Sequence, residues 1–187
     1  MSDKTEIRAG FLGLPQAGWA ALGSAGTICT LATLIFGVVQ YAQSLEAERA
    51  KQTLEMVKEW RDDGYRASFL YLAEPTSVEM GKLDAEDIAY LEKNAEARRN
   101  VAAKIAKTVL SNTQDSEQAL GDVVYFFNLL GLCVEARLCS EATAMGFFDS
   151  TVLDFFSVFE SEIAARQSTQ PDYAAGMTFL VDRFSQN

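Results

Sequence analysis

The sequence contains no histidine among its 187 residues. This absence excludes Ser-His-Asp and Cys-His catalysis, a histidine general base and any metal site with an imidazole ligand. Cysteine is also scarce, with only Cys29, Cys133 and Cys139. Because no Cys-x-x-Cys pair occurs and Cys29 lies in an apolar segment, we expect no disulfide framework. Buried packing of Cys133 and Cys139 in a reducing compartment fits this pattern.

Basic residues are few. The chain has 16 Lys and Arg against 26 Asp and Glu, which gives a net charge of −10. A general nucleic-acid-binding protein needs a basic face to neutralise phosphates, and a polybasic surface that binds lipid headgroups needs the same. We therefore expect no nucleic-acid partner.

Charge is missing altogether from one long stretch. No charged residue lies between Arg8 and Glu46. The apolar part of this stretch, residues 18–41, exceeds the roughly 20 residues that a helix needs to cross a bilayer. Trp19 and Tyr41 are 22 positions apart, about 33 Å along a helix, so each ring can lie near one membrane interface. The stretch predicts a transmembrane helix after a short N-terminal segment, residues 1–17.

A cleaved signal peptide is the alternative for this segment. Its basic region would contain only Lys4 and Arg8, offset by Asp3 and Glu6. The apolar run also exceeds the usual 7–15 residues, and no clear cleavage site follows it. We interpret the segment as an uncleaved anchor.

The basic residues beside the span predict its orientation. Two precede it, Lys4 and Arg8, and four follow it closely: Arg49, Lys51, Lys58 and Arg61. The positive-inside rule therefore places the C-terminal domain in the cytoplasm and the N-terminus outside, in the inner (cytoplasmic) membrane.

Small side chains recur at every fourth position of the span. They are Ala21, Ala25, Cys29, Thr33 and Gly37. Membrane helices associate through such ridges, because close backbone approach gives dispersion contacts in a solvent without a hydrophobic driving force. The ridge favours a homo-oligomer in the lipid bilayer. The alternative is that Gly, Ala and Thr are simply common in membrane helices.

Residues 42–187 have the size of one ordinary domain. No Gly or Pro occurs between Gly37 and Gly64, so we expect the membrane helix to continue to about Trp60 or Asp62. A short helix should then end before Pro75, and residues 75–83 read as a loop.

Asp84 should begin the next helix. With Glu86 and Asp87 it could suggest a metal site, but three carboxylates at a helix start are more typical of a cap. That helix carries a heptad-like seam: Ile88, Leu91, Ala95, Arg98, Ala102, Ile105 and Val109. Arg98 in the seam must reach the surface, pair with a carboxylate such as Glu135 or Glu160, or bind an anion.

Three further helices complete the domain. The first, about residues 117–138 with Asp115 or Ser116 as its cap, is apolar nearly all round, which is typical of the centre of a bundle. Its apolar run of about 13 residues is too short for a second span. The last two helices carry apolar faces: Phe148, Val152, Phe155, Phe156, Phe159 and Ile163, then Tyr173, Met177, Leu180, Val181 and Phe184. The fold class is therefore all-α, with one N-terminal transmembrane helix continuing into a cytoplasmic helical bundle.

The stretches AERAKQTLEMVKEW, DVVYFFNLLGLCVEARLCS and FFDSTVLDFFSVFESEIAARQSTQPDYAAGMTFLVDRF resemble a bacterial family known as domain of unknown function 4760. The residues that match its pattern are Thr53, Leu54, Trp60, Asn128, Ile163, Arg166 and Tyr173. This sequence has Gly131 where the family often has an acidic residue, three places after the Asn. The resemblance implies membrane anchoring and a helical fold, and it supplies no established activity.

A looser similarity is to the small membrane-anchored accessory proteins of type VI CRISPR systems. In these, one span and a helical cytosolic domain assemble into a pore-like oligomer. Some carry an RNase-like Arg…His motif, which ARRNVAAKI cannot provide without histidine. The similarity therefore implies the architecture and not the nuclease activity. A role in bacterial defence is the expectation that goes with this architecture.

Arg98, Arg99, Lys104 and Lys107 form the most basic patch of this acidic chain. Arg98 and Arg99 suit a phosphate or nucleotide ligand, because the guanidinium fork makes bidentate contacts with anions. A structural ion pair is the simpler interpretation and is favoured. We expect no catalytic residue, cofactor or metal.

Three functions remain open. The first is a non-enzymatic membrane effector or signalling component that self-associates, and we favour it. The second is an anchored adaptor that recruits a soluble protein partner, which predicts an exposed apolar patch on the domain. The third is an enzyme that uses carboxylates, Arg, Lys or Ser, and the spacing shows no place where such groups converge.

Overall fold

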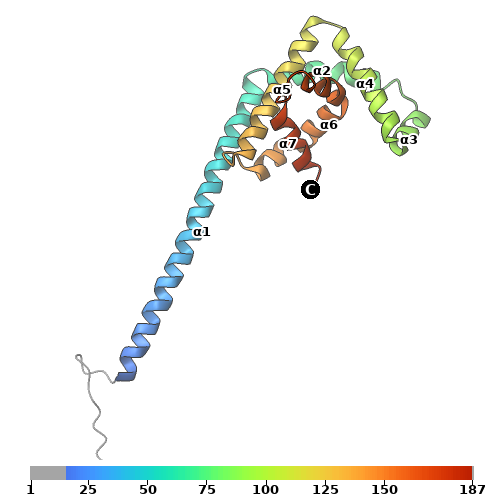
Figure 1. Ribbon diagram of the computed structural model, residues 1–187. Helices are drawn as coiled ribbons and strands as arrows, with labels where there is room; N and C mark the ends of the chain where they lie inside the picture. The colour runs from blue at the N-terminus through green and yellow to red at the C-terminus, as the bar shows by residue number, and fades with distance from the viewer. Residues whose placement is uncertain (1–15, 187) are drawn as a thin grey trace, which may run out of the picture. The chain divides into compact units, whose positions relative to one another are not determined.

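The computed structural model describes the backbone of residues 16–186 and the side chains of residues 33–186. Over these residues the chain forms seven α-helices and no β-strand (Figure 1). The helices are α1 (Gln16–Asp62), α2 (Tyr65–Met80), α3 (Ala85–Lys93), α4 (Ala95–Ser111), α5 (Gln114–Glu135), α6 (Glu141–Gln167) and α7 (Ala175–Phe184). The predicted all-α class is confirmed. The chain divides into two units, residues 1–47 and 48–187.

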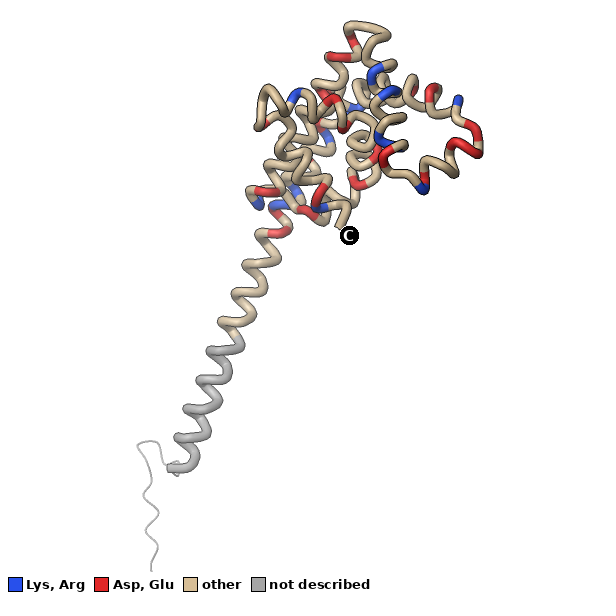
Figure 2. Tube along the Cα trace, turned by 45° about the vertical axis from the view of Figure 1, so that its right-hand side comes forward, with Lys and Arg blue, Asp and Glu red and all other residues tan. Residues whose placement is uncertain are grey.

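The first unit contains the uncharged stretch. Its described part before Glu46 carries no Lys, Arg, Asp or Glu (Figure 2), and the apolar side chains Leu34, Ile35, Phe36 and Val38 are 62–68% exposed. Segment 1–17 and most of the predicted span 18–41 lie outside the described side chains. The same holds for three ridge residues, Ala21, Ala25 and Cys29. The span therefore stays a prediction, as does the ridge.

The second unit is a bundle built around α5. Its buried side chains come from every turn of the helix: Ser116, Ala119, Leu120, Val123, Val124, Phe126, Phe127, Leu130 and Val134. Helices α2, α4, α6 and α7 all pack against α5. Among the described residues α5 alone is long and apolar enough to cross a membrane, and half of its apolar stretch is buried inside the bundle. The central position predicted for this helix is confirmed, although Tyr125, Leu129 and Leu132 remain exposed.

Helix α1 ends at Asp62, as the sequence predicts, and Gly64 forms the break with φ +91°. Only glycine adopts this left-handed conformation without a steric penalty. The predicted end of α2 is wrong, because the helix continues through Pro75 to Met80. Proline removes one backbone donor inside a helix. In the same turn the hydroxyls of Thr76 and Ser77 donate to the carbonyls of Leu72 and Glu74, both at 2.7 Å.

The single helix predicted after Asp84 is in fact two helices, α3 and α4, which break at Asn94. Asn94 ends α3 in an extended conformation, and its side chain then accepts a hydrogen bond from the Ala97 amide (3.0 Å) as the cap of α4. The heptad-like seam is therefore only half correct. Ile105 and Val109 are buried, whereas α3 has no buried residue and packs only against α4 among the described helices (Figure 1).

The predicted cap at Asp84 is confirmed. Its carboxylate accepts hydrogen bonds from the amides of Glu86 (2.9 Å) and Asp87 (2.8 Å), and the Asp87 carboxylate accepts from the Asp84 amide. The cap predicted for α5 is wrong, since Thr113 precedes the helix and shares a hydroxyl hydrogen bond with Ser116 (3.1 Å). The two apolar faces predicted near the C-terminus are buried or half-buried along α6 and α7.

Tyr65, at the start of α2, makes the stability of the bundle sensitive to alkaline pH. Its ring packs on Phe126 with centroids 5.3 Å apart. Burial raises the pKa of the Tyr65 phenol, and the neighbouring Tyr125, Asp63, Glu59 and Asp122 raise it further. In the unfolded chain a tyrosine ionises near pH 10. The bundle is therefore stabilised below that pH by the neutral phenol, and this contribution is lost as the pH rises through the higher pKa of the folded state.

We expect the free energy of unfolding to fall more steeply above about pH 10 in the native chain than in Tyr65→Phe. Denaturant titrations between pH 8 and 11 measure this slope. Tyr90→Phe, which removes an exposed phenol, is the matched control. Equal slopes for the native chain and Tyr65→Phe would contradict the assignment.

Candidate functional site

The residues that match the family pattern gather at joints between helices of the second unit. Thr53 of α1 is fully buried. Its hydroxyl donates to the Arg49 carbonyl (2.9 Å) and accepts from the backbone amide of Ser140 (2.9 Å). The Ser140 side chain in turn accepts from the Thr143 amide (3.3 Å) as the cap of α6. Thr53 therefore ties α1 to the start of α6.

A disulfide between Cys133 and Cys139 lies next to this joint, and it corrects the prediction that the cysteines only pack. The two Cα atoms are 5.2 Å apart. Arg137 adopts a left-handed conformation (φ 58°) between them, and this turn brings the two cysteines together. Cys139 also contacts Met56 of α1, with its Sγ atom 3.7 Å from the Met56 Sδ atom. The sequence separation of six residues gave no direct sign of a bond that depends on this turn.

We expect reduction of this disulfide to lower the free energy of unfolding by about 2 kcal/mol, because the unfolded chain gains entropy when so short a loop is opened. Denaturant titrations of the full chain with and without a dithiol reductant measure the difference. The double variant Cys133→Ser and Cys139→Ser should match the reduced chain and show no further response to reductant. A native chain that is equally stable in both conditions would contradict the expectation.

Trp60 lies at the centre of an aromatic cluster. Its ring centroid is 4.8 Å from that of Phe126, 5.2 Å from Phe127, 5.7 Å from Phe148 and 5.9 Å from Phe69. These rings come from α2, α5 and α6, so the indole joins α1 to three other helices. Leu54, another residue of the family pattern, is 48% exposed and takes no part in the cluster.

Asn128 fixes the crossing of α5 and α7. Its side-chain oxygen accepts a hydrogen bond from the Gly176 amide at 2.8 Å. The two backbones approach so closely here that a Cβ atom on Gly131 would lie 1.8 Å from the Gly176 carbonyl oxygen. No side chain fits between the helices at position 131. This contact could not be predicted from sequence patterns, because Gly176 is distant from Asn128 and Gly131 along the chain.

Arg166 and Tyr173 form the joint between α6 and the turn before α7. The Arg166 guanidinium makes an ion pair with Glu117 of α5 and lies 5.7 Å from the centre of the Tyr173 ring. The neighbouring Ile163 is fully buried. The polar residues of the family pattern thus already have partners within the bundle, and their contacts are structural.

Arg98 and Arg99 lie in a different place, on the exposed side of α4. The ion pair predicted between Arg98 and Glu135 or Glu160 does not form. The side chains of Arg98 and Arg99 make no hydrogen bond or ion pair with any residue that the structure describes. Both line a groove of about 590 Å³ between the end of α2, α3, α4 and α6. Glu160 lines the same groove.

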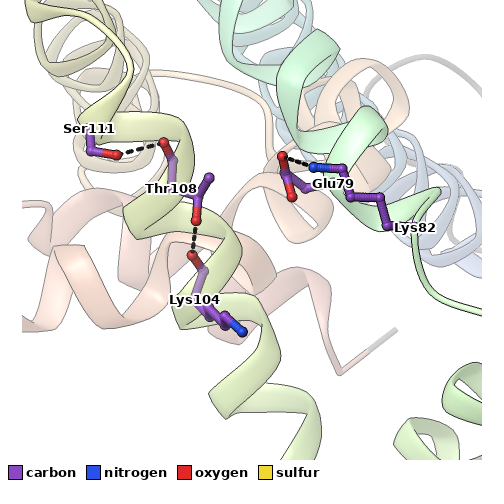
Figure 3. Close-up of polar contacts among 5 residues, drawn as sticks. All are labelled: Glu79, Lys82, Lys104, Thr108 and Ser111. Atoms are coloured by element: carbon purple, nitrogen blue, oxygen red, sulfur yellow. Dashed lines mark hydrogen bonds and ion pairs between the residues drawn. The ribbon is translucent and has the colours of Figure 1, made fainter.

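The wall of this α4–α6 groove is mainly apolar, with Met80, Leu83, Leu91, Val101, Ile105 and Val158. Figure 3 shows polar contacts of the helices beside this groove. At the end of α2, Glu79 and Lys82 form an ion pair at 2.5 Å. On α4, the backbone carbonyl of Lys104 accepts a hydrogen bond from the Thr108 hydroxyl, and the Lys104 ammonium group points away from Thr108. Within the described residues no group of His, Cys, Asp or Glu side chains is arranged to hold a metal ion. The groove is therefore a place where both predicted arginines, Arg98 and Arg99, face an open space.

Comparison with known proteins gives one match. The family model described as Domain of unknown function (DUF4760) matches residues 27–184. Neither a curated protein nor a solved structure matches the chain. Because the match covers most of the 187 residues, the chain belongs to the DUF4760 family.

Proposed function

We propose that this protein is a single-pass membrane protein that self-associates and acts as a non-enzymatic membrane effector or signalling component. The observation that carries the proposal is the uncharged stretch from residue 9 to residue 45. Its described apolar side chains are exposed, as a helix surrounded by lipid requires. The small-residue ridge supplies the contact for self-association.

The bundle of the second unit supports a role without enzymatic chemistry. Thr53, Asn128 and Arg166 are the polar residues of the family pattern, and each contributes to packing of the helices. These polar groups therefore hold the helices together, which is consistent with a non-enzymatic role. A role in bacterial defence belongs to the same proposal and rests on the looser architectural resemblance.

The proposal places the bundle in the cytoplasm, on the side of Arg49, Lys51, Lys58 and Arg61. The Cys133–Cys139 disulfide is more typical of an oxidising compartment, so orientation is the first point to test. Protease added to spheroplasts should leave the bundle intact if it is cytoplasmic. Degradation of the bundle in intact spheroplasts would show that the bundle lies outside the cytoplasm and that the proposed orientation is wrong.

Substitution at Gly37 tests self-association through the span. A Cβ atom at Gly37 meets nothing within 4 Å in the chain itself. Any loss of association in Gly37→Leu must therefore come from a contact with another molecule. We expect the native mass in mild detergent to fall towards that of the monomer. Val39→Leu, which adds bulk about 200° around the helix, should keep the native mass of the unaltered chain.

A monomeric native chain would contradict the proposal and favour the second candidate, an anchored adaptor. One observation supports that candidate. Tyr125, Leu129 and Leu132 of α5 follow one another at steps of four and three residues, and all three are exposed. An adaptor would lose its soluble partner in Leu129→Lys without a change in native mass, and a self-associating effector would not depend on this residue.

A further inference from the structure

The α4–α6 groove and helix α3 have complementary surfaces within one chain. The groove presents Arg98 and Arg99 beside an apolar wall. Helix α3 and its cap carry four carboxylates, Asp84, Glu86, Asp87 and Glu92, against a single Lys93. In a chain of net charge −10, the most basic surface and one of the most acidic helices therefore lie on adjoining elements.

Helix α3 also exposes apolar side chains. Ile88 is 48% exposed and Tyr90 is 60% exposed, and the helix has no buried residue. Ile88 and Leu91 share one face because they are three residues apart. Asp87 lies four residues before Leu91 and Glu92 lies four residues after Ile88, so a carboxylate flanks this face on each side. An amphipathic helix with this pattern fits an apolar groove that is edged by cations.

The seam predicted from the sequence is consistent with such an occupant. Five of its members, Leu91, Ala95, Arg98, Ala102 and Ile105, contribute to the lining of the groove. Steps of three and four residues along a helix form the surface that receives a second helix. A free phosphate would use the two arginines alone, and it would meet the carboxylate of Glu160 in the same groove. A helix that presents both apolar and acidic side chains matches the apolar wall as well as the two arginines.

We propose that the α4–α6 groove binds helix α3 of a second copy of this chain. The contact is reciprocal, since each copy offers one groove and one α3, as a two-fold interface requires. Helix α3 has nine residues, which is a small contact compared with a standard interface. It depends on the span to bring the copies together, and in this respect the inference rests on the proposed function.

Charge reversal with rescue tests the contact. In the full chain in mild detergent, Arg98→Glu and Glu92→Lys should each weaken association by about tenfold or more, because like charges then face each other across the interface. A mixture of the two variants should associate as the native chain does. In the mixed pair one contact carries the reversed charges and the other carries the native ones.

Both variants should fold. Glu92→Lys adds a cation near the C-terminus of α3, where it complements the helix dipole. Arg98→Glu breaks no ion pair among the described residues and places an anion near the N-terminus of α4. The matched controls are Glu86→Lys on the other side of α3 and Lys107→Glu on α4, which does not line the groove. Both controls should keep native association. Single variants that keep the native mass, or a mixture that is not rescued, would overturn the inference.

A second measurement separates this inference from the proposed function. Two differently tagged copies in membrane vesicles, one with Ile88→Cys and one with Val158→Cys in a Cys29→Ser background, should crosslink through a short bismaleimide. Absence of the crosslinked pair overturns the inference, and if the Gly37→Leu effect is present the proposed self-association through the span still stands. Saturable binding of inorganic phosphate that Arg98→Glu abolishes, without an effect of Glu92→Lys on mass, would overturn it in favour of an anion site.

Discussion

Substitution of Gly131 by alanine is expected to lower the free energy of unfolding by about 3 kcal/mol or more, the upper part of the range for overpacked interiors. The new Cβ atom would lie 1.8 Å from the carbonyl oxygen of Gly176, 2.3 Å from its carbonyl carbon and 2.8 Å from its Cα atom. All three are backbone atoms, so no side chain can turn aside. Helices α5 and α7 would have to separate, and the hydrogen bond from Gly176 to Asn128 would break with them.

Gly121→Ala is the matched control in the same helix. A Cβ atom at Gly121 meets nothing within 4 Å. Replacement of an unconstrained glycine within a helix stabilises it by about 0.5–1 kcal/mol. Denaturant unfolding of the full chain, followed by near-UV circular dichroism, should therefore show effects of opposite sign for two identical changes in α5. If Gly131→Ala unfolds within about 0.5 kcal/mol of the native chain, the two helices do not cross as closely as described.

The secondary structure could be predicted where the signal is local. The end of α1 near Asp62, the break at Gly64 and the cap at Asp84 all follow from the residues themselves. Local rules failed at Pro75, since α2 continues past the proline to Met80. They failed again at Asn94, where an apolar seam crosses the boundary between two helices.

The joints of the bundle could not be predicted, since each depends on residues that are distant along the chain. Thr53 meets Ser140 and Asn128 meets Gly176 only after the helices pack. The disulfide depends on the left-handed turn at Arg137. For Arg98 the favoured ion pair with Glu135 or Glu160 is wrong, and the structure shows the side chain exposed on α4. The sequence thus shows which side chains can form hydrogen bonds, ion pairs or a disulfide, but it does not show which residues they contact in the folded chain.

Trp60→Ala is the other substitution with a large expected effect, a loss of about 3–5 kcal/mol in the free energy of unfolding. The indole contacts rings from α2, α5 and α6 and is 8% exposed. Removal of the indole leaves a cavity bordered by four phenylalanine rings. It also removes edge-to-face and tilted contacts between rings, which stabilise the fold beyond the burial of apolar area. Trp60→Phe keeps part of these contacts and should cost less.

Leu54→Ala is the control, since Leu54 lies on the same helix and also belongs to the family pattern. Its exposure predicts a change within about 0.5 kcal/mol. Denaturant titrations of the three variants in one detergent give the comparison directly. A small loss for Trp60→Ala would mean that α1 is not held to the bundle by this cluster. Leu54→Ala can also be compared in two backgrounds, the self-associated native chain and the Gly37→Leu variant. A large loss of unfolding free energy in the first background alone would show that another copy covers Leu54.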